Sequence, residues 1–190
     1  MFKKIIVSFS LLALSLSAFA ADNPQVRIVT NKGNIEIELN KDKAPITVEN
    51  FLKYTKSDYY SGTVFHRVIK GFMIQGGGFT QDFKRKKVNA AIQNEAFNGL
   101  KNERGTIAMA RTGQPHSATA QFFINTVNNR SLNHTGKSQR GWGYTVFGKV
   151  TKGLDVVDSI ENSKTGPRSM FRGDVPKEDI IIQKVEVINK

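Results

Sequence analysis

Alternation of apolar and polar residues is the first pattern along the chain, and it indicates a hairpin. The stretch QVRIVT alternates and is rich in β-branched residues. After the turn sequence NKG, Ile35, Ile37 and Leu39 fall on one face of a second strand, while Glu36 and Glu38 fall on the other. Because successive side chains of a strand point to opposite faces, the pattern predicts a half-buried β-hairpin.

Helical spacing appears in two places. The stretch APITVENFLKYTKS begins with Pro45, which suits the first turn of a helix, and its apolar residues recur at helical intervals. The stretch GLDVVDSIEN shows the same spacing, with Leu154, Val157 and Ile160 on one face. Both stretches therefore predict amphipathic helices.

Short strand patterns fill the rest of the chain, separated by segments rich in Gly, Asn and Ser. They are TVFHRVI, FMIQGG, GTIAMA, QFFINT, YTVFGKV and the closing DIIIQKVEVINK. Together with the hairpin this makes about eight strands and two helices, with no alternation of strand and helix. The pattern predicts an antiparallel sheet or barrel capped by helices. No linker divides residues 21–190, so we expect a single domain with a core over residues 25–188.

Residues 1–20 have the order of a secretory signal. Two lysines precede an apolar run that ends in the small-x-small sequence AFA. The run is short for a membrane anchor, which needs roughly 20 apolar residues, and serines interrupt it. We therefore expect cleavage after Ala20, export, and no stable insertion into a membrane.

The chain is strongly basic, with a formal net charge of +12. Such a balance favours acidic partners or anionic surfaces. The densest basic run is FKRKK, residues 83–87, and a run this short is typical of a solvated loop. Neither a zinc-finger spacing nor a basic helix with heptads accompanies it, so we expect no nucleic-acid partner.

The residues that most enzymatic chemistries require are missing. The chain has no cysteine, and His66, His116 and His134 share no metal-ligand spacing. His66 lies inside an apolar strand, which predicts a core residue. No G-x-S-x-G sequence is present for a hydrolase triad. The glycines at 76–78 lack the Lys-Ser/Thr pair of a phosphate loop, so they indicate backbone geometry. We expect neither a metal nor a cofactor.

One stretch, FHRVIKGFMIQGGG, combines a fixed cation and an amide with large apolar residues. On a strand, residues i and i+2 share a face, which puts Phe65 and Arg67 together. The same rule puts Gln121 and Phe123 on one side of QFFI and Phe122 on the other. Core packing would explain each phenylalanine, and a salt bridge with an acidic residue would explain Arg67. Position alone leaves these interpretations open.

Four blocks of the sequence, in order, resemble the cyclophilins, the cyclosporin-binding family of peptidyl-prolyl cis-trans isomerases. The blocks are FHRVIKGFMIQGGGFT, NERGTIAMAR, SATAQFFINT and YTVFGKVTKGLDVVD. The start of the mature chain, the missing cysteines and Tyr144 before TVFGKV are similar to the bacterial periplasmic branch. The resemblance implies a closed eight-stranded antiparallel barrel with a helix at each end. It also implies isomerisation of X–Pro bonds during the folding of exported proteins in the periplasm.

The resemblance carries a site over residue by residue. Arg67 matches the catalytic arginine, which would donate a hydrogen bond to the prolyl nitrogen of the twisted bond. Gln75 matches the glutamine that braces this arginine and touches the substrate backbone. Apolar residues match the walls of the proline pocket, and residues 110–112 match the segment beside the bound peptide. The substrate-binding residues implied are Phe72, Met73, Ala110, Arg111, Thr112, Gln121, Phe123, Leu132 and Tyr144.

Three positions depart from the better-known members of the family. Arg111 stands where many have asparagine, although this residue pairs through its main chain, and Tyr144 stands where many have histidine. At the pocket rim Ser131 precedes Leu132, where many members carry a tryptophan. The only tryptophan, Trp142, lies in the loop NHTGKSQRGWGY, and the alignment leaves open whether it refills the rim. Because the family's rim tryptophan helps hold cyclosporin, we expect weak binding of that drug.

The partners implied are proline-containing polypeptides, and we expect the protein to act as a monomer. Two alternatives stay open beside catalysis. A pure binding module would need only the apolar pocket, so the presence of both Arg67 and Gln75 argues against it. Anion binding through the basic surface would weaken with salt, because surface charge is screened within about 10 Å at 0.1 M. Neither alternative excludes catalysis.

Overall fold

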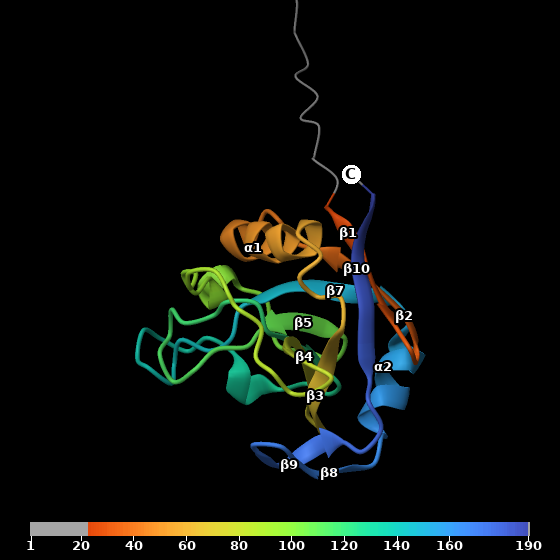
Figure 1. Cartoon of the computed structure of the whole chain (residues 1–190). Helices are drawn as coiled ribbons and strands as arrows, with labels where there is room; N and C mark the ends of the chain where they lie inside the picture. Colours follow the sequence, from red (N-terminus) through yellow and green to blue (C-terminus); the bar gives the residue numbers. More distant parts are fainter. Residues whose placement is uncertain (1–22, 190) are drawn as a thin grey trace, which may run out of the picture.

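Eight strands close into a barrel in the computed structural model, which describes residues 23–189 (Figure 1). Their order around the barrel is β1-β10-β3-β4-β6-β5-β7-β2, and every neighbouring pair is antiparallel. The barrel strands are β1 Gln25–Thr30, β2 Gly33–Leu39, β3 Thr63–Ile69, β4 Met73–Thr80, β5 Thr106–Met109, β6 Phe122–Asn125, β7 Val146–Lys152 and β10 Ile181–Asn189. The predicted fold class is confirmed, while the predicted leader lies outside the described residues.

The first hairpin follows the alternation of its sequence. β1 and β2 pair in register, with Ile28 opposite Ile35. Ile35, Ile37 and Leu39 are fully buried in the barrel. β1 also pairs with β10, near the other end of the chain, and this pairing helps to close the barrel without a free edge.

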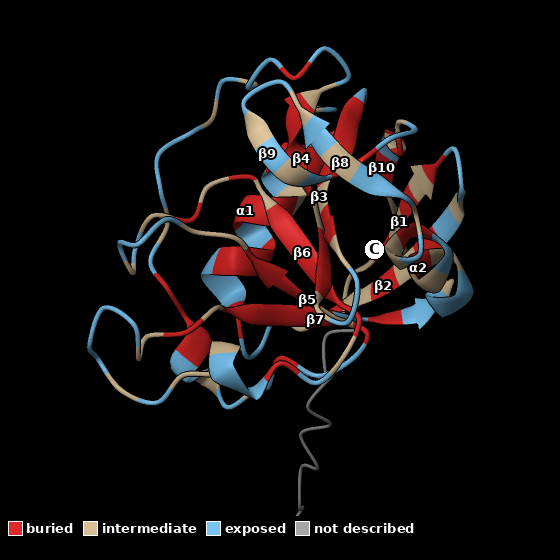
Figure 2. Ribbon diagram, turned by 90° about the horizontal axis from the view of Figure 1, so that it is seen from below, coloured by how far each residue is buried: buried red, intermediate tan, exposed pale blue. Residues whose placement is uncertain are grey.

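Two α-helices cover the barrel, as the periodicity predicts: α1 Pro45–Lys56 and α2 Leu154–Glu161. In α1, Phe51 is fully buried, and its ring lies 5.1 Å from that of Tyr60 and 5.3 Å from that of Phe147. α2 packs against β2, β3 and β4. Because β2 and β4 are far apart in the strand order, a helix that contacts both lies over an end of the barrel. The buried residues in Figure 2 follow these packed faces.

A second, two-stranded sheet follows α2 and was not expected from the sequence. It consists of β8 Thr165–Arg168 and β9 Phe171–Pro176, and it packs against β3. Its sequence TGPRSMFRGDVP carries two prolines and two glycines and lacks apolar alternation, so it does not have the usual signature of strands. Two short 3₁₀ helices, Ala96–Asn98 and Arg130–Leu132, lie in the connecting loops. Within residues 23–189, no helix is long and apolar enough to cross a bilayer.

Candidate active site

A bulge in β3 places Arg67 on the outside of the barrel. Phe65 lies opposite Gly76 and Arg67 lies opposite Gln75, so β3 advances two residues while β4 advances one. Phe65 packs inside the barrel, edge-on to Phe122 at 6.0 Å between ring centroids. The expectation that Phe65 and Arg67 share a face is therefore wrong, because the bulge shifts the alternation by one residue.

Three neighbouring strands bring the candidate chemical groups side by side. Arg67 of β3 lies opposite Gln75 of β4, which in turn lies opposite Phe123 of β6. Arg67 Nη1 donates a hydrogen bond to Gln75 Oε1 at 3.4 Å, and Gln75 Nε2 donates to Gln121 Oε1 at 2.9 Å. The guanidinium group is thus braced by a chain of two amides, while 39% of the Arg67 side chain stays exposed.

A pocket of about 260 Å³ opens beside this row of side chains. Met73 and Phe123 are almost fully buried at its base, and Phe72, Leu132 and Tyr144 pack around them. The residues that line it are Arg67, Phe72, Met73, Gln75, Ala110, Arg111, Phe123, Leu132 and Tyr144. An adjoining pocket of about 130 Å³ shares Gln75, Ala110 and Arg111 and adds Thr112 and Gln121. The structure therefore brings together all the site residues that the sequence resemblance implies.

The Arg111 side chain takes part in shaping the pocket. Its Nε donates a hydrogen bond to the Gly143 carbonyl oxygen at 2.8 Å, and its guanidinium carbon lies 4.6 Å from the centre of the Tyr144 ring. The Tyr144 ring in turn meets Phe123 edge-on at 5.7 Å. The resemblance assigns this position a main-chain role alone, and the structure adds that the side chain holds the pocket wall in place.

Buried asparagines fix the backbone behind the pocket, and sequence reasoning missed them. Asn129 Nδ2 donates to the Phe72 carbonyl oxygen at 2.8 Å. Asn102 Nδ2 donates to the carbonyl oxygens of Leu132 at 3.2 Å and Tyr144 at 3.3 Å. Buried amides with satisfied hydrogen bonds make a rigid support. For Asn129 the only sequence signal is the gathering of asparagines in VNNRSLN, which is equally typical of an exposed loop, and Asn102 lies outside that stretch.

The glycines that follow Gln75 serve backbone geometry, as predicted. Gly77 has a φ of +79°, in the left-handed region that favours glycine. At Gly78, an added Cβ would lie 2.5 Å from Cγ of Gln121. Glycine at this position therefore leaves room for the amide that braces Gln75.

His66 is a core residue, as its position in the strand predicts. It is 2% exposed, and its ring lies 4.7 Å from that of Phe79 and 5.5 Å from that of Phe171 in β9. Burial, together with a smaller effect of the Arg67 charge, lowers the pKa of His66 to about 4. His66 is therefore neutral at pH 7. Within residues 23–189, His, Cys, Asp and Glu form no group of three or more that could hold a metal ion.

Trp142 does not refill the rim of the pocket. Its ring packs against those of His116 at 4.7 Å, His134 at 5.6 Å and Phe97 at 6.3 Å. A hollow of about 630 Å³ lies beside Ser131, and Trp142 is not among the residues that line it. The rim position is therefore occupied by a small polar side chain.

The basic run at 83–87 is only partly the solvated loop that the sequence indicates. Phe83 is buried, and Lys86 is half-buried. The Lys86 ammonium group donates to the carbonyl oxygens of Tyr59 and Ser61 and lies 4.8 Å from the centre of the Tyr59 ring. The run is thus anchored to the barrel at two points.

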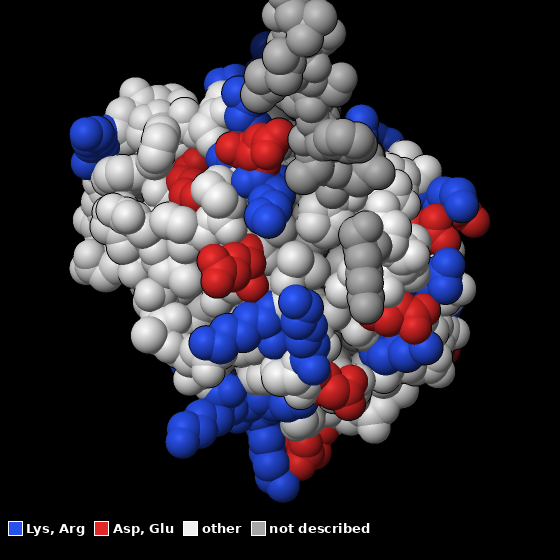
Figure 3. All heavy atoms as spheres, turned by 90° about the horizontal axis from the view of Figure 1, so that it is seen from above, with Lys and Arg blue, Asp and Glu red and all other residues white. Residues whose placement is uncertain are grey.

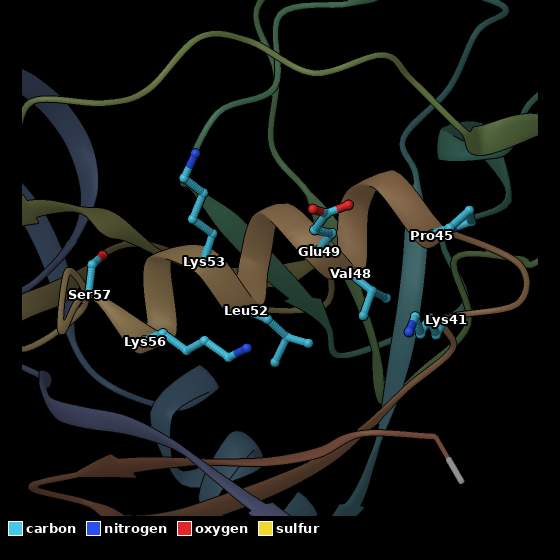
Figure 4. A pocket seen from close by; sticks show the side chains of 8 residues that line it. All are labelled: Lys41, Pro45, Val48, Glu49, Leu52, Lys53, Lys56 and Ser57. Atoms are coloured by element: carbon cyan, nitrogen blue, oxygen red, sulfur yellow. The ribbon is translucent and has the colours of Figure 1, made fainter. Parts of the chain in front are cut away.

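A larger, open hollow of about 860 Å³ lies along α1 and shares no residue with the pocket at Arg67. Figure 4 shows Lys41 and Lys56 on the same side of the helix as Val48 and Leu52, while Lys53 points away. Figure 3 shows that basic side chains gather in groups on the face above α1, interspersed with acidic ones. Among the residues that line this hollow, none is a donor held by a neighbouring side chain next to a buried apolar surface, as Arg67 is. We therefore place the candidate active site at Arg67.

Comparison with known proteins agrees with the geometry. The family model for "Cyclophilin type peptidyl-prolyl cis-trans isomerase/CLD" matches residues 25–187. The chain belongs to the cyclophilin family. This cyclophilin is 60% identical over 158 residues to "Peptidyl-prolyl cis-trans isomerase B" of Escherichia coli (strain K12), covering 83% of this chain and 96% of that relative. It is 47% identical over 186 residues to "Peptidyl-prolyl cis-trans isomerase A" of Dickeya dadantii (strain 3937), covering 98% and 96%. The chain is a peptidyl-prolyl cis-trans isomerase, as the resemblance implies.

Solved structures show the same barrel. A crystal structure of a cyclophilin-type peptidyl-prolyl cis-trans isomerase from Cryptosporidium parvum matches this cyclophilin with a TM-score of 0.70 at 30% identity. The match covers 88% of this chain and 99% of that one. A second structure of the Cryptosporidium protein, determined in the presence of the dipeptide Ala-Pro, matches with the same TM-score.

Proposed function

We propose that this cyclophilin isomerises X–Pro bonds in unfolded exported proteins and that Arg67 supplies the catalytic hydrogen bond. One observation carries the proposal: a braced guanidinium group beside an apolar pocket of about 260 Å³. The pocket suits the proline ring, and the guanidinium group lies at its edge. The adjoining pocket beside Thr112 and Gln121 suits the residues that precede proline.

The chemistry of the X–Pro bond explains why such a site is sufficient. Rotation about the bond removes amide resonance, which sets a barrier of about 18–20 kcal/mol. In the twisted state the prolyl nitrogen regains its lone pair. A donor aimed at that nitrogen stabilises the twisted state and finds little to bond in the planar one, so it lowers the barrier. No covalent bond is made or broken, so the step needs no nucleophile.

The required rate increase is within the range of such a site. Uncatalysed exchange takes tens to hundreds of seconds. Bringing it to milliseconds needs about 10⁴-fold, or roughly 5.5 kcal/mol. Arginine suits the donor's role because its guanidinium group is planar and permanently charged. Its hydrogen bond to Gln75 limits the orientations that it can adopt.

The test is a protease-coupled assay on a short X–Pro peptide with Arg67→Ala. We expect a loss in kcat/KM of at least about 100-fold with the fold retained, because removal of one transition-state donor has effects of that size. Arg172→Ala is the matched control, since Arg172 is exposed on β9 and loses the same charge. Near-wild-type turnover of Arg67→Ala would remove Arg67 from the proposed role.

Export to the periplasm is supported by the signal-like order of residues 1–20. The Dickeya relative aligns over 98% of this chain, so the aligned segment includes most of that leader. We expect protein isolated from the native cell envelope to begin at Ala21 by intact mass spectrometry. A mature chain that begins at Met1 would contradict export with cleavage.

We further propose that the enzyme acts as a monomer and binds cyclosporin weakly. Every residue assigned to the site comes from one chain, so a partner subunit is not needed to complete it. Weak binding of the drug follows from Ser131 at the rim, where little apolar surface is available. Sedimentation of the mature protein tests the first statement, and an inhibition titration tests the second.

A further inference from the structure

The β8–β9 hairpin packs against β3, the strand that carries Arg67, and against aromatic residues next to it. The ring of Phe171 packs against those of Phe79 at 5.2 Å and Phe83 at 5.9 Å. Val175 and Pro176 are buried at the end of β9. The hairpin thus holds a defined position beside β3, and its side chains can act on the site.

Asp174 lies in this hairpin with an uncommon backbone conformation. Its φ is +63°, in the left-handed region that costs most residues roughly 1–2 kcal/mol and that Asp and Asn tolerate best. Here the conformation brings Oδ2 of Asp174 to 3.8 Å from Nε of Arg67. Neither side chain is buried, since 49% of Asp174 and 39% of Arg67 are exposed.

The guanidinium group of Arg67 therefore has two contacts at separate atoms, a hydrogen bond and an ion pair. Nη1 donates to Gln75 Oε1 at 3.4 Å, and Nε faces the Asp174 carboxylate. Within residues 23–189, Nη2 makes no hydrogen bond to a protein group. Two contacts on a planar group restrict both its position and its rotation, and they leave Nη2 free to donate to a substrate.

We propose that Asp174 is a positioning residue, which orients the Arg67 guanidinium group so that its free donor points into the proline pocket. The inference rests on the proposed role of Arg67. The ion pair between Asp174 and Arg67 is exposed, so it should add little to the free energy of unfolding. Its effect should instead appear in the rate of isomerisation. Arginine side chains have many rotamers, and restricting them before the twisted state forms removes an entropic cost from the barrier.

The test uses two substitutions that keep the backbone of the hairpin. Asp174→Asn and Asp174→Gly both suit a positive φ, and both remove the carboxylate. We expect each to lower kcat about three- to tenfold with KM changed less than about twofold, because the loss lies in orientation at the transition state. The Nε–H resonance of Arg67 should shift in the same variants, which tests the contact in solution. A purely structural role would lower the melting temperature and would not predict a loss in kcat with KM unchanged.

Glu178→Gln is the matched control. Glu178 lies just beyond the hairpin, 86% of its side chain is exposed, and it pairs with Lys32 in the turn between β1 and β2. The substitution removes the same charge without touching Arg67, so we expect kcat to stay within about 1.5-fold of wild type. Melting temperatures of all variants check that the hairpin stays folded.

A double variant separates this proposal from the one on which it rests. If Arg67 is catalytic and Asp174 acts through it, Asp174→Asn should have no further effect in the Arg67→Ala background. Full activity of Arg67→Ala would overturn the proposed mechanism itself. Loss of activity in Arg67→Ala together with unchanged kcat in both Asp174 variants would overturn the positioning role alone.

Discussion

Glu95 provides the N-terminal cap of α1 from a distant loop, and we expect its replacement to lower the stability of the fold. Ala44, at the N-cap position, makes no side-chain hydrogen bond. Instead, Glu95 Oε1 accepts from the Ile46 backbone N–H at 3.1 Å, and Oε2 accepts from the Thr47 N–H at 2.8 Å and from Thr47 Oγ1 at 2.7 Å. Glu95 is 6% exposed, and its carboxylate lies at the positive end of the helix.

The magnitude follows from these three bonds. Glu95→Gln keeps one acceptor oxygen and replaces the other with an NH₂ group, which cannot accept a hydrogen bond. One hydrogen bond is lost if NH₂ replaces Oε1, and two are lost if it replaces Oε2. Hydrogen bonds to charged groups contribute about 1.5–3 kcal/mol each. Loss of the charge at the helix N-terminus adds about 0.3–1 kcal/mol. We expect a net loss of about 3 kcal/mol in the free energy of unfolding, or roughly 6–12 °C in Tm for a domain of this size.

The assay is thermal melting of the mature protein, followed by circular dichroism, with Glu49→Gln as the control. Glu49 is exposed on α1 and loses the same charge, so its effect should be within about 0.5 kcal/mol. Activity at 20 °C should persist in Glu95→Gln, since Glu95 touches neither pocket. A melting temperature for Glu95→Gln within about 2 °C of the control would refute the capping role.

Three further predictions concern pH, the glycine run and the rim. Burial lowers the pKa of His66 from 6.5 to about 4, so the unfolded chain binds the proton more readily than the folded one. The free energy of unfolding should therefore be highest above pH 6.5 and fall by about 3 kcal/mol as the pH drops toward 4. Urea titrations of wild type and His66→Phe over this pH range should show the loss in the wild type alone. Gly78→Ala should displace the Gln121 side chain and break its 2.9 Å hydrogen bond to Gln75. We expect kcat/KM in the peptide assay to fall about three- to tenfold, and unchanged activity would show that the hydrogen bond between Gln75 and Gln121 is dispensable. Ser131→Trp should tighten inhibition by cyclosporin about ten- to hundredfold and leave turnover little changed, because a partly covered indole contributes about 1–3 kcal/mol. Tight inhibition of the wild type would contradict the prediction that Ser131 makes drug binding weak.

The local pattern of the sequence determined the barrel. Strict alternation in the first hairpin and helical spacing in α1 and α2 depend on neighbouring residues alone, so they could be predicted and are confirmed. The resemblance of FHRVIKGFMIQGGG to a known family then located the pocket. What sequence reasoning got wrong was the face of Phe65, because a bulge depends on how two strands pair and leaves no pattern in either strand.

Only the tertiary structure decided which acidic residue pairs with Arg67. The sequence left a salt bridge open, and Asp174 is distant along the chain in a hairpin that lacks strand signals. The same holds for Glu95, which caps a helix almost 50 residues before it, and for Asn102 and Asn129 behind the pocket. Polar side chains are indistinguishable from loop residues until the barrel closes, because their partners are chosen by proximity in space and not by spacing along the chain.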